Sequence, residues 1–408
     1  MEDKCLMAFR PIHPFPARMA PSIALEALNL SLRRRPLTVL DPMVGSGTTV
    51  VAARSKGHAA IGFDTDPLAV LLASCWSSDI EKEAATTAGK SVLRNARRRY
   101  QDLRQRDSYP DGADEETRKF LRYWFDVTNR TQLRALADAI SKVSTEITRN
   151  ICWCAFSRLI IAKSRGASRA MDLSHSRPHR AFERGPLRPF EGFLEAVQHI
   201  ANNAAFRAPS NERLAATVSI ADARKLPLDA ASVDLVITSP PYLNAIDYLR
   251  CSKFSLVWMG HTVDELRKLR AANIGTEVAR GVGLLAPPIP EVLAALEPLD
   301  ALPERWKGVL GRYVQDMDTV VAEMARVLKP GGEAVLVVGD STVRGVFIRN
   351  SVALLTLAAR HGMTTLSTTR RELPPSRRYL PPPSTKSAGD RFSGRMREEV
   401  VLRLQASS

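Results

Sequence analysis

Nine residues, Asp41-Pro42-Met43-Val44-Gly45-Ser46-Gly47-Thr48-Thr49, are the most informative part of this sequence. The apolar run Leu37–Leu40 before them is typical of a buried strand, and Val50–Ala53 after them is typical of the start of a helix. A strand, a glycine turn and a helix N-terminus bring unpaired backbone N–H groups together, where they can bind a small ligand. We therefore expect a ligand-binding loop at residues 41–49.

The 408 residues, 45% hydrophobic and 25% charged, have the composition of a globular protein large enough for more than one structural unit. No apolar run is long enough to cross a bilayer, and the N-terminus lacks a charged-then-apolar secretion signal. We therefore expect a cytoplasmic protein with no membrane partner.

The five cysteines, at positions 5, 75, 152, 154 and 251, are irregularly spaced. Cys152 and Cys154 are two positions apart, which is too close for the usual metal-binding pair, and no second pair follows. We expect reduced, packed thiols and no metal site.

The net charge of +15 favours a polyanionic partner, because basic groups that neutralise phosphates release counterions. Residues 81–210 hold 24 Lys and Arg against 15 Asp and Glu, and so carry +9 of this charge. The alternative is a basic surface without a partner, since charge asymmetry alone is not specific.

Apolar runs that are typical of buried strands alternate with helical stretches at both ends of the chain. The expected strands are residues 37–40, 58–63, 216–220, 233–238, 334–338 and 398–402, and the expected helices are 48–56 and 312–328. Strands that are apolar throughout are expected where helices cover both faces of a parallel sheet. The pattern predicts an α/β fold with a doubly wound, Rossmann-like sheet.

Residues 81–210 interrupt this pattern. Apolar residues recur at steps of three and four from Leu133 to Cys154, which predicts one long amphipathic helix. The stretch 164–190 is basic and loop-like. We interpret 81–210 as a mainly helical insertion, 270–308 as a second, irregular insertion, and 1–80 with 211–408 as the sheet domain.

In the glycine loop, Gly45 and Gly47 leave room for a ligand to approach the backbone, and Ser46 adds a hydroxyl. The helix that starts at Thr48 offers amides that suit a carboxylate. No Lys follows the second glycine, so a Walker A phosphate loop is the weaker interpretation. The next strand ends at Asp64, an acid placed to accept hydrogen bonds from ribose hydroxyls. The alternative is a helix cap in a protein that binds no nucleotide.

A third expected strand is followed by Ala221-Asp222-Ala223-Arg224. In a sheet of this kind Asp222 would face the amino group of an adenine. An aspartate that only forms a turn explains the local sequence equally well.

The second informative stretch is Thr238-Ser239-Pro240-Pro241-Tyr242, at the end of another apolar strand. Two prolines end the strand and fix the backbone, so the Ser239 hydroxyl and the Pro240 carbonyl could be directed at one point. Two acceptors that hold the hydrogens of a nucleobase amino group would favour its attack on a methyl group. Tyr242 would stack on the base, since stacking supplies about 1–3 kcal/mol per base against an extrusion cost of a few kcal/mol. The alternative is a rigid turn with a packed tyrosine.

With these motifs the chain resembles the site-specific DNA amino-methyltransferases, which use S-adenosylmethionine. Asp41–Thr49 resembles the cofactor loop of that family, and Thr238–Tyr242 resembles its catalytic motif. His13-Pro14-Phe15-Pro16-Ala17-Arg18-Met19 resembles its N-terminal cofactor motif. Arg377–Pro383 with Arg395–Glu399 resembles a late segment of one bacterial branch.

The resemblance implies a role for each matching position. The residues expected to bind the cofactor are His13, Pro14, Phe15, Asp41, Pro42, Gly45, Ser46, Gly47, Thr48, Asp64 and Asp222. The residues expected to bind the target base are Ser239, Pro240, Pro241 and Tyr242. Met43 departs from the family, because an aromatic residue is common at that position.

The activity implied is that of a site-specific DNA methyltransferase, which moves a methyl group from S-adenosylmethionine to the exocyclic amino group of a flipped base. Ser at the head of the catalytic motif is commoner among enzymes that methylate cytosine N4, whereas Asp or Asn is commoner for adenine N6, so cytosine is favoured. The alternatives are an RNA amino-methyltransferase and a non-catalytic, cofactor-binding DNA regulator. The family also allows a cognate restriction endonuclease as a partner; the oligomeric state stays open.

The expected DNA contacts within the insertion are Arg165, Arg169, Arg177 and Arg180. They follow from charge and placement, because 81–210 has no aligned counterpart in the family. The hypothesis as a whole depends on one geometric expectation. The glycine loop and the catalytic motif must lie at neighbouring strand ends and face a shared cleft.

Overall fold

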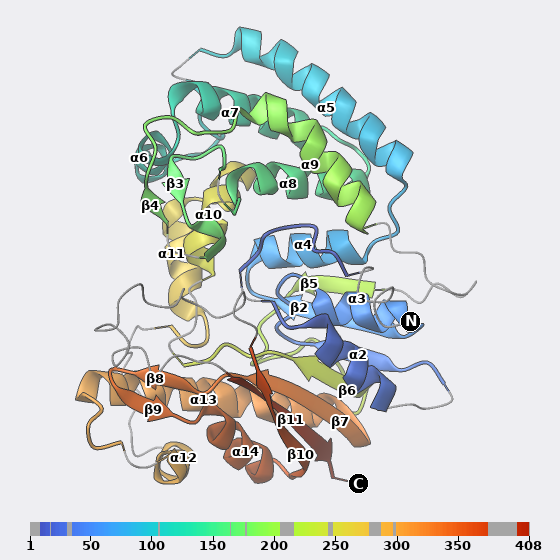
Figure 1. Cartoon of the computed structure of the whole chain (residues 1–408), viewed down its shortest axis with the longest axis vertical. Coiled ribbons are helices and arrows are strands. Elements are labelled where there is room, and N and C mark those ends of the chain that lie inside the picture. Colours follow the sequence, from blue (N-terminus) through green and yellow to red (C-terminus); the bar gives the residue numbers. More distant parts are fainter. Residues whose placement is uncertain are drawn as a thin grey trace. The chain divides into compact units, whose positions relative to one another are not determined.

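The computed structural model describes residues 9–16, 18–30, 35–104, 107–163, 165–175, 178–204, 216–243, 248–276, 287–296, 299–373 and 398–407 (Figure 1). The chain divides into two compact units. Unit 1 comprises residues 1–26, 44–220 and 247–270, and unit 2 comprises residues 27–43, 221–246 and 271–408. Boundaries between the units therefore fall inside the expected sheet domain.

Unit 1 contains most of the helices. Its elements are α3 (Thr48–Ser55), β2 (Ala59–Asp64), α4 (Pro67–Ser77), α5 (Lys82–Asp102), α6 (Glu115–Trp124), α7 (Val127–Ser141), α8 (Glu146–Ile160), β3 (Ala170–Met171), β4 (His179–Arg180), α9 (Pro189–Ala204), β5 (Ala216–Ile220) and α10 (Leu249–Leu256). Two further helices, α2 (Pro21–Leu30) and α11 (Val263–Ala272), each contain a boundary between the units.

Unit 2 contains most of the strands. Its elements are β1 (Thr38–Asp41), β6 (Val233–Thr238), α12 (Ile289–Leu296), α13 (Glu304–Val327), β7 (Leu328–Val338), β8 (Ser341–Val343), β9 (Val346–Ile348), α14 (Asn350–Arg360), β10 (Met363–Glu372) and β11 (Glu398–Ala406).

Seven strands form one sheet in the order β10-β11-β7-β6-β1-β2-β5. In unit 2, β6 pairs in parallel with β1 and with β7, whereas β11 is antiparallel to both β7 and β10. In unit 1, β2 and β5 are parallel. Helices α13 and α14 pack on the strands of unit 2, and α3 and α4 pack on those of unit 1. The expected α/β fold with a mainly parallel sheet is confirmed.

The strand β6 is buried along its whole length, which explains its continuous apolar sequence. Its one charged residue, Asp234, joins three strands. The carboxylate accepts hydrogen bonds from Arg35 at 2.6 Å and from the amide of Thr38, the first residue of β1, at 2.9 Å, and it pairs with Lys329 of β7 at 3.0 Å. Burial would raise the pKa of Asp234, but these donors hold that pKa below its usual value.

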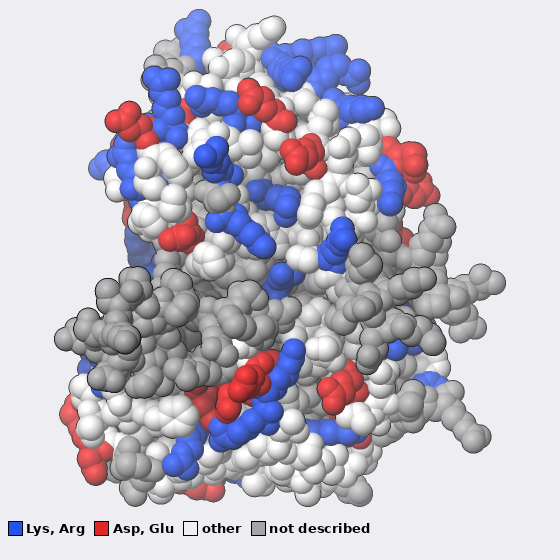
Figure 2. All heavy atoms as spheres, viewed as in Figure 1, with Lys and Arg blue, Asp and Glu red and all other residues white. Residues whose placement is uncertain are grey.

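The helices of the predicted insertion pack on one another, because α5 contacts α7 and α9, and α8 also contacts α9 (Figure 1). Figure 2 shows Lys and Arg side chains gathered over α5, whose Arg94, Arg97, Arg98 and Arg99 are exposed. The mainly helical character of 81–210 agrees with the sequence analysis.

The single long helix expected over 133–154 is wrong, because α7 ends at Ser141 and α8 begins at Glu146. Ser144 and Thr145 lie between the two helices, and serine and threonine are residues that favour turns and helix starts over helix interiors. Apolar residues still recur at intervals of three and four on both sides of the turn, because each of the two helices buries one face. The buried members are Leu133, Leu136, Ile140, Ile151 and Cys154, whereas Ile147 is 45% exposed.

The stretch 270–308 is more regular than expected. It contains α12, whose Ile289, Val292 and Leu296 are buried at helical spacing, and the first turn of α13. The prolines at 287 and 288 precede α12, a position that a helix tolerates. Similarly, the loop-like stretch 164–190 contains the short antiparallel pair of β3 and β4.

Cys75, Cys152, Cys154 and Cys251 are buried and form no disulfide among the described residues, as expected, whereas Cys5 lies outside the described residues. Burial raises the pKa of Cys152 to about 12 and keeps that thiol protonated. In the part of the chain that the structure describes, no helix combines the length and the apolar character needed to cross a membrane.

We expect Asp234→Ala to lower the free energy of unfolding by roughly 1.5–3 kcal/mol, because the Thr38 amide and two cations lose a buried, charged acceptor. Asp229→Ala is the matched control, since Asp229 is an exposed aspartate in the turn before the same strand. Urea denaturation followed by circular dichroism measures both variants. Equal stability of the two variants would contradict the role assigned to Asp234.

Candidate active site

The two sequence motifs start from adjacent strands of unit 2. Strand β1 ends at Asp41 and strand β6 ends at Thr238, and these strands pair in parallel. The Thr238 hydroxyl donates a 2.7 Å hydrogen bond to the Asp41 carboxylate, which also accepts from the Met43 amide at 3.1 Å. Asp41, Pro42 and Thr238 are all buried. The expectation that both motifs begin at neighbouring strand ends is confirmed, whereas a shared cleft stays a prediction.

The glycine loop has the backbone that its sequence predicts. Gly45 and Gly47 have φ angles of 50° and 96°, in the left-handed region that favours glycine. A Cβ atom on Gly47 would lie 2.8 Å from the Cα atom of Ala73 on α4, so Gly47 is also required for packing. Helix α3 begins at Thr48 without a side-chain cap.

The loop also contains a polar atom that suits a ligand. The hydroxyl of Ser46 is buried and has no hydrogen-bond partner among the described residues. Because buried polar groups are normally hydrogen-bonded, this hydroxyl is a candidate partner for a polar group of a bound ligand. Together with the uncapped amides at the start of α3, it fits a small polar ligand such as the amino acid end of S-adenosylmethionine.

Asp64 lies against this loop, as its place in the sequence predicts. Its carboxylate accepts hydrogen bonds of 2.9 Å from the Gly45 amide and from the Asp66 amide. Burial raises the pKa of Asp64, and the backbone hydrogen bonds act against this shift. The strand β2 and the glycine loop are thus joined through one carboxylate, and the ribose contact stays a prediction.

Asp66 is a neighbour of this site that the sequence analysis did not select. Its carboxylate accepts hydrogen bonds from the Leu68 amide at 2.9 Å, which caps α4, and from the Ser252 hydroxyl of α10 at 2.6 Å. Burial and the nearby charge of Asp64 raise the pKa of Asp66 to about 7. The sequence Asp66-Pro67 before an apolar run is a helix-start signal that could have identified the cap, though not the pairing with Ser252.

His13 and Phe15, expected to close over the cofactor, are packed within unit 1. The Nε2 atom of His13 lies 3.0 Å from the Ser157 hydroxyl, which lies 2.8 Å from the Ser255 hydroxyl. Burial, with the charge of Arg158, lowers the pKa of His13 to about 3 and keeps the ring neutral. Phe15 stacks on Tyr248 with ring centroids 5.9 Å apart. These contacts give His13 and Phe15 a structural role, and the cofactor contact of His13, Pro14 and Phe15 stays a prediction.

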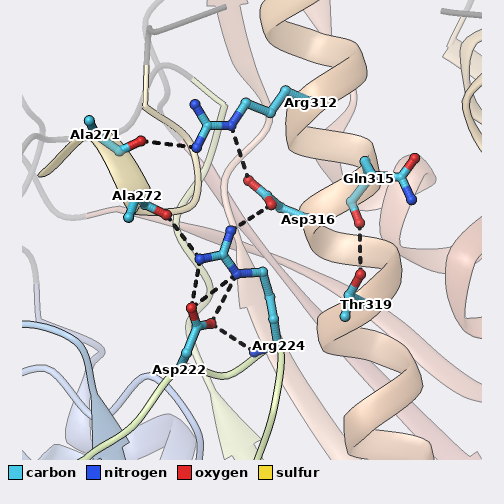
Figure 3. Close-up of polar contacts among 8 residues, drawn as sticks. All are labelled: Asp222, Arg224, Ala271, Ala272, Arg312, Gln315, Asp316 and Thr319. Atoms are coloured by element: carbon cyan, nitrogen blue, oxygen red, sulfur yellow. Dashed lines mark hydrogen bonds and ion pairs between the residues drawn. The ribbon is translucent and has the colours of Figure 1, made fainter. Parts of the chain in front are cut away.

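Asp222 belongs to an ion-pair network (Figure 3). The guanidinium of Arg224 contacts both Asp222 carboxylate oxygens, at 2.6 Å for Nη2 and 3.0 Å for Nε, and contacts Asp316 of α13 at 2.7 Å. It also donates to the Ala272 carbonyl at 2.9 Å. Arg312 lies 3.7 Å from Asp316 and extends the network. Burial would raise the pKa of Asp222, but Arg224 holds that pKa below its usual value. Arg224 thus binds both oxygens of the Asp222 carboxylate. The contact of Asp222 with an adenine stays a prediction.

The Ser-Pro-Pro-Tyr motif, expected to bind the target base, places Ser239 and Tyr242 close together. The Ser239 hydroxyl donates a 3.0 Å hydrogen bond to the Val337 carbonyl of β7, and its oxygen lies 3.5 Å from the Tyr242 hydroxyl. Pro240 is buried, whereas Ser239, Pro241 and Tyr242 are partly exposed. Burial of the phenol raises the pKa of Tyr242 to about 12, so its hydroxyl stays protonated at neutral pH.

Two further residues near this motif are distant in the sequence. Tyr313 of α13 is 1% exposed, and its hydroxyl has no hydrogen-bond partner among the described residues. Burial raises the pKa of Tyr313, and the electrostatic influence of Tyr242 adds to this shift. Glu399 of β11 likewise raises the pKa of Tyr242. No local motif marks either residue, so sequence reasoning missed both.

The arginines expected to contact DNA differ in their surroundings. Arg165 is exposed, whereas Arg169 donates to the carbonyls of Arg122 and Tyr123 and so holds the end of α6. Arg180 lies 5.2 Å above the Tyr123 ring. Arg177 lies outside the described residues, as do the matching tail segments 377–383 and 395–397. DNA contact by these arginines stays a prediction.

Because the pKa of Asp66 is raised in the folded state, the free energy of unfolding should depend on pH. The folded state binds more protons than the unfolded state between about pH 4 and pH 7, so Asp66 lowers the stability of the fold as the pH rises through this range. Asp66→Asn keeps an oxygen to cap α4 and cannot ionise. We therefore expect the stability of this variant, relative to the wild type, to increase by up to roughly 4 kcal/mol from pH 4 to pH 8.

Urea denaturation at a series of pH values measures this difference. His13 acts with the opposite sign, since its lowered pKa costs stability as the pH falls below about 6.5, and it cancels in the comparison because both proteins contain it. A difference that does not change with pH would contradict the assignment.

Comparison with known proteins gives two similar sequences and many similar folds. No model of a protein family matches the chain. It is 24% identical to the Type II methyltransferase M.MvaI of Kocuria varians, over 96% of this chain and 90% of that protein. It is 23% identical to the Type II methyltransferase M.BsoBI of Geobacillus stearothermophilus, over 74% and 68%.

Among solved structures, a SAM-dependent methyltransferase of Methanosarcina mazei covers 96% of this chain and 99% of its own, at 10% identity and a TM-score of 0.33. The fold assignment depends on the strand order and not on this likeness. The sequence similarity extends over most of both relatives, as the resemblance of the motifs predicted. Over most of its length the chain is thus similar to two Type II methyltransferases, in agreement with the resemblance that its motifs indicated.

Proposed function

We propose that this protein transfers a methyl group from S-adenosylmethionine to the exocyclic amino group of a base extruded from DNA, and that the acceptor is N4 of cytosine. Methylation of adenine N6 is the close alternative. The observation that carries the proposal is the hydrogen bond from the Ser239 hydroxyl to the Val337 carbonyl.

This hydrogen bond defines what Ser239 can do for a substrate. A serine hydroxyl has one hydrogen to donate and two lone pairs that accept. Because the hydrogen is donated to Val337, the oxygen is left as an acceptor for an N–H group of the target base. The carbonyl of Pro240, the next residue, would be the second acceptor. Two acceptors on one amino group draw its nitrogen towards the tetrahedral geometry that a nucleophile needs.

The remaining residues of the motif have supporting roles. Tyr242 would stack on the extruded base, and the buried Pro240 keeps the turn rigid. The raised pKa of Tyr242 excludes its hydroxyl as the base that takes a proton at neutral pH. The proton lost from the methylated amino group would therefore pass to water.

On the cofactor side, Gly45–Thr48 and Asp64 are the residues that we propose to hold S-adenosylmethionine. The uncapped amides at the start of α3 suit its carboxylate, and the unpaired Ser46 hydroxyl suits a polar group of its amino acid end. Asp64 would accept the ribose hydroxyls. When bound, the cofactor supplies an electrophilic methyl group on a sulfonium.

Mass spectrometry of nucleosides tests the reaction and its base. DNA of mixed sequence is incubated with the full chain and S-adenosylmethionine, digested and analysed. We expect N4-methylcytosine. N6-methyladenine would select the alternative base, methylation of RNA alone would reject a DNA substrate, and cofactor binding without any methyl transfer would support a non-catalytic regulator.

We expect Ser239→Ala to lower kcat roughly 10- to 1000-fold while the Kd for S-adenosylmethionine stays near the wild-type value, because one acceptor for the amino group is lost. Ser239→Asp, which restores an acceptor, should recover part of the activity.

Tyr242→Ala should weaken DNA binding and turnover, whereas Tyr242→Phe, which keeps the ring, should retain both. Single-turnover assays and calorimetric cofactor titration measure these effects. Equal loss of cofactor affinity in Ser239→Ala or Tyr242→Ala would contradict their assignment to the base.

A further inference from the structure

Unit 1 contains a cavity of about 500 Å³ between α6, α10 and α11, which is distinct from the residues assigned to the cofactor or to the target base. This volume is typical of a ligand site. Most of the residues that line it are basic or aromatic, and both properties restrict the chemistry of a ligand that would fit.

The first property is a strong excess of positive charge. The ionisable side chains that line the cavity are Lys119, Arg250, Lys253, Arg267, Arg270 and one acid, Glu116. Glu116 and Asp264 both pair with Arg267, so the acids close to the cavity are already engaged by a cation. Basic side chains thus outnumber acidic ones five to one along the cavity, and this excess would attract a ligand with more than one negative charge.

The second property is an aromatic wall on α6. Phe120, Tyr123 and Trp124 line the cavity, and Tyr123 is 50% exposed. Trp124 packs edge-on against Tyr123 at 4.8 Å and against Phe254 of α10 at 4.9 Å between ring centroids. Because Phe254 is fully buried, these rings form a rigid support, and the exposed Tyr123 ring is held in place for a further planar group.

Cations lie directly over these rings. The Nζ atom of Lys253 is 5.2 Å from the centre of the Phe120 ring, and the guanidinium of Arg180 is 5.2 Å from the centre of the Tyr123 ring. Exposed rings interleaved with cations are the arrangement that binds unstacked nucleotides, since rings stack on bases and cations contact phosphates.

We propose that this cavity, which we name the α6–α10 groove, binds a stretch of the DNA substrate in which at least one base is unstacked. Lys119, Arg250 and Lys253 contact the phosphates, and Tyr123 stacks on a base other than the one that is methylated. The proposal rests on the proposed DNA substrate and adds the surface that holds it. An acidic peptide would satisfy the cations and leave the exposed tyrosine ring without a planar partner.

The sequence connects this groove to the catalytic motif. Leu249, the first residue of α10, follows Tyr242 by only seven positions. Arg250 and Lys253 lie on the first two turns of that helix. These two cations therefore follow Tyr242 by only eight and eleven positions in the sequence.

Three variants test the groove by fluorescence anisotropy, with a labelled DNA duplex of mixed sequence, S-adenosylhomocysteine as the bound cofactor product, and a series of salt concentrations. Lys119→Gln with Lys253→Gln removes two groove cations. Tyr123→Leu removes the exposed ring. Lys56→Gln with Lys142→Gln is the matched control, because it removes the same charge from exposed positions of unit 1 outside the groove.

We expect the groove double variant to weaken DNA binding and to reduce the slope of log affinity against log salt by about 1–2. Tyr123→Leu should weaken binding about 5- to 150-fold with the slope unchanged, since stacking involves no counterion release. The control should match the wild type. An equal loss of slope in the control, wild-type binding by both groove variants, or groove-dependent binding of a matched RNA hairpin but not of DNA would overturn the proposal.

Methylation assays on the same proteins separate this proposal from the proposed function. If the wild type methylates DNA while the groove variants bind DNA normally, the function stands and the groove assignment fails. If the wild type binds DNA through the groove but methylates no base, the groove assignment stands and the function fails. Calorimetric titration with S-adenosylhomocysteine confirms that each variant is folded.

Discussion

The hydrogen bond between Thr238 and Asp41 is the interaction on which the proposed chemistry depends. It joins the ends of two parallel strands at the point where each strand gives way to a functional motif. Both partners are buried, so loss of either would leave an unpaired polar group in the core. Asp234 joins the other ends of these strands to Arg35 and Lys329. The register of β1 and β6 is thus held at both ends, and it sets where both motifs begin.

The aspartates near the two motifs have different roles, which depend on whether they are buried or partly exposed. Asp41 and Asp66 are buried and accept hydrogen bonds from backbone and hydroxyl donors, which fixes the ends of strands and helices. Asp64 has the same contacts with the backbone but is partly exposed, so it can also meet a ligand. Asp222 differs from these three, because its carboxylate is held by the guanidinium of Arg224, and its contact with an adenine stays a prediction.

The basic side chains also fall into two groups, those bound within the fold and those that line the α6–α10 groove. Arg169, Arg224 and Arg134 bind backbone carbonyls or carboxylates within the fold, so their charges are largely used in structure. The groove between α6 and α10 differs, because its cations outnumber its acids and lie beside exposed rings. A count of Lys and Arg therefore favours a polyanionic partner, but only the placement of each side chain shows which cations gather at one groove.

Local patterns were sufficient for six of the seven strands of the sheet, the glycine loop and the Ser-Pro-Pro-Tyr turn, because apolar runs, positive φ angles at Gly45 and Gly47, and proline geometry are properties of a few adjacent residues. Strand β10 was missed, because it is mostly exposed and has no apolar run. The break between α7 and α8 escaped detection, since two helices that each bury one face give the same apolar step as a single helix. A contact between distant residues, such as that of Ser239 with Val337, exists only after the strands pack, because side-chain partners across a core are chosen by tertiary packing and not by neighbours in the chain.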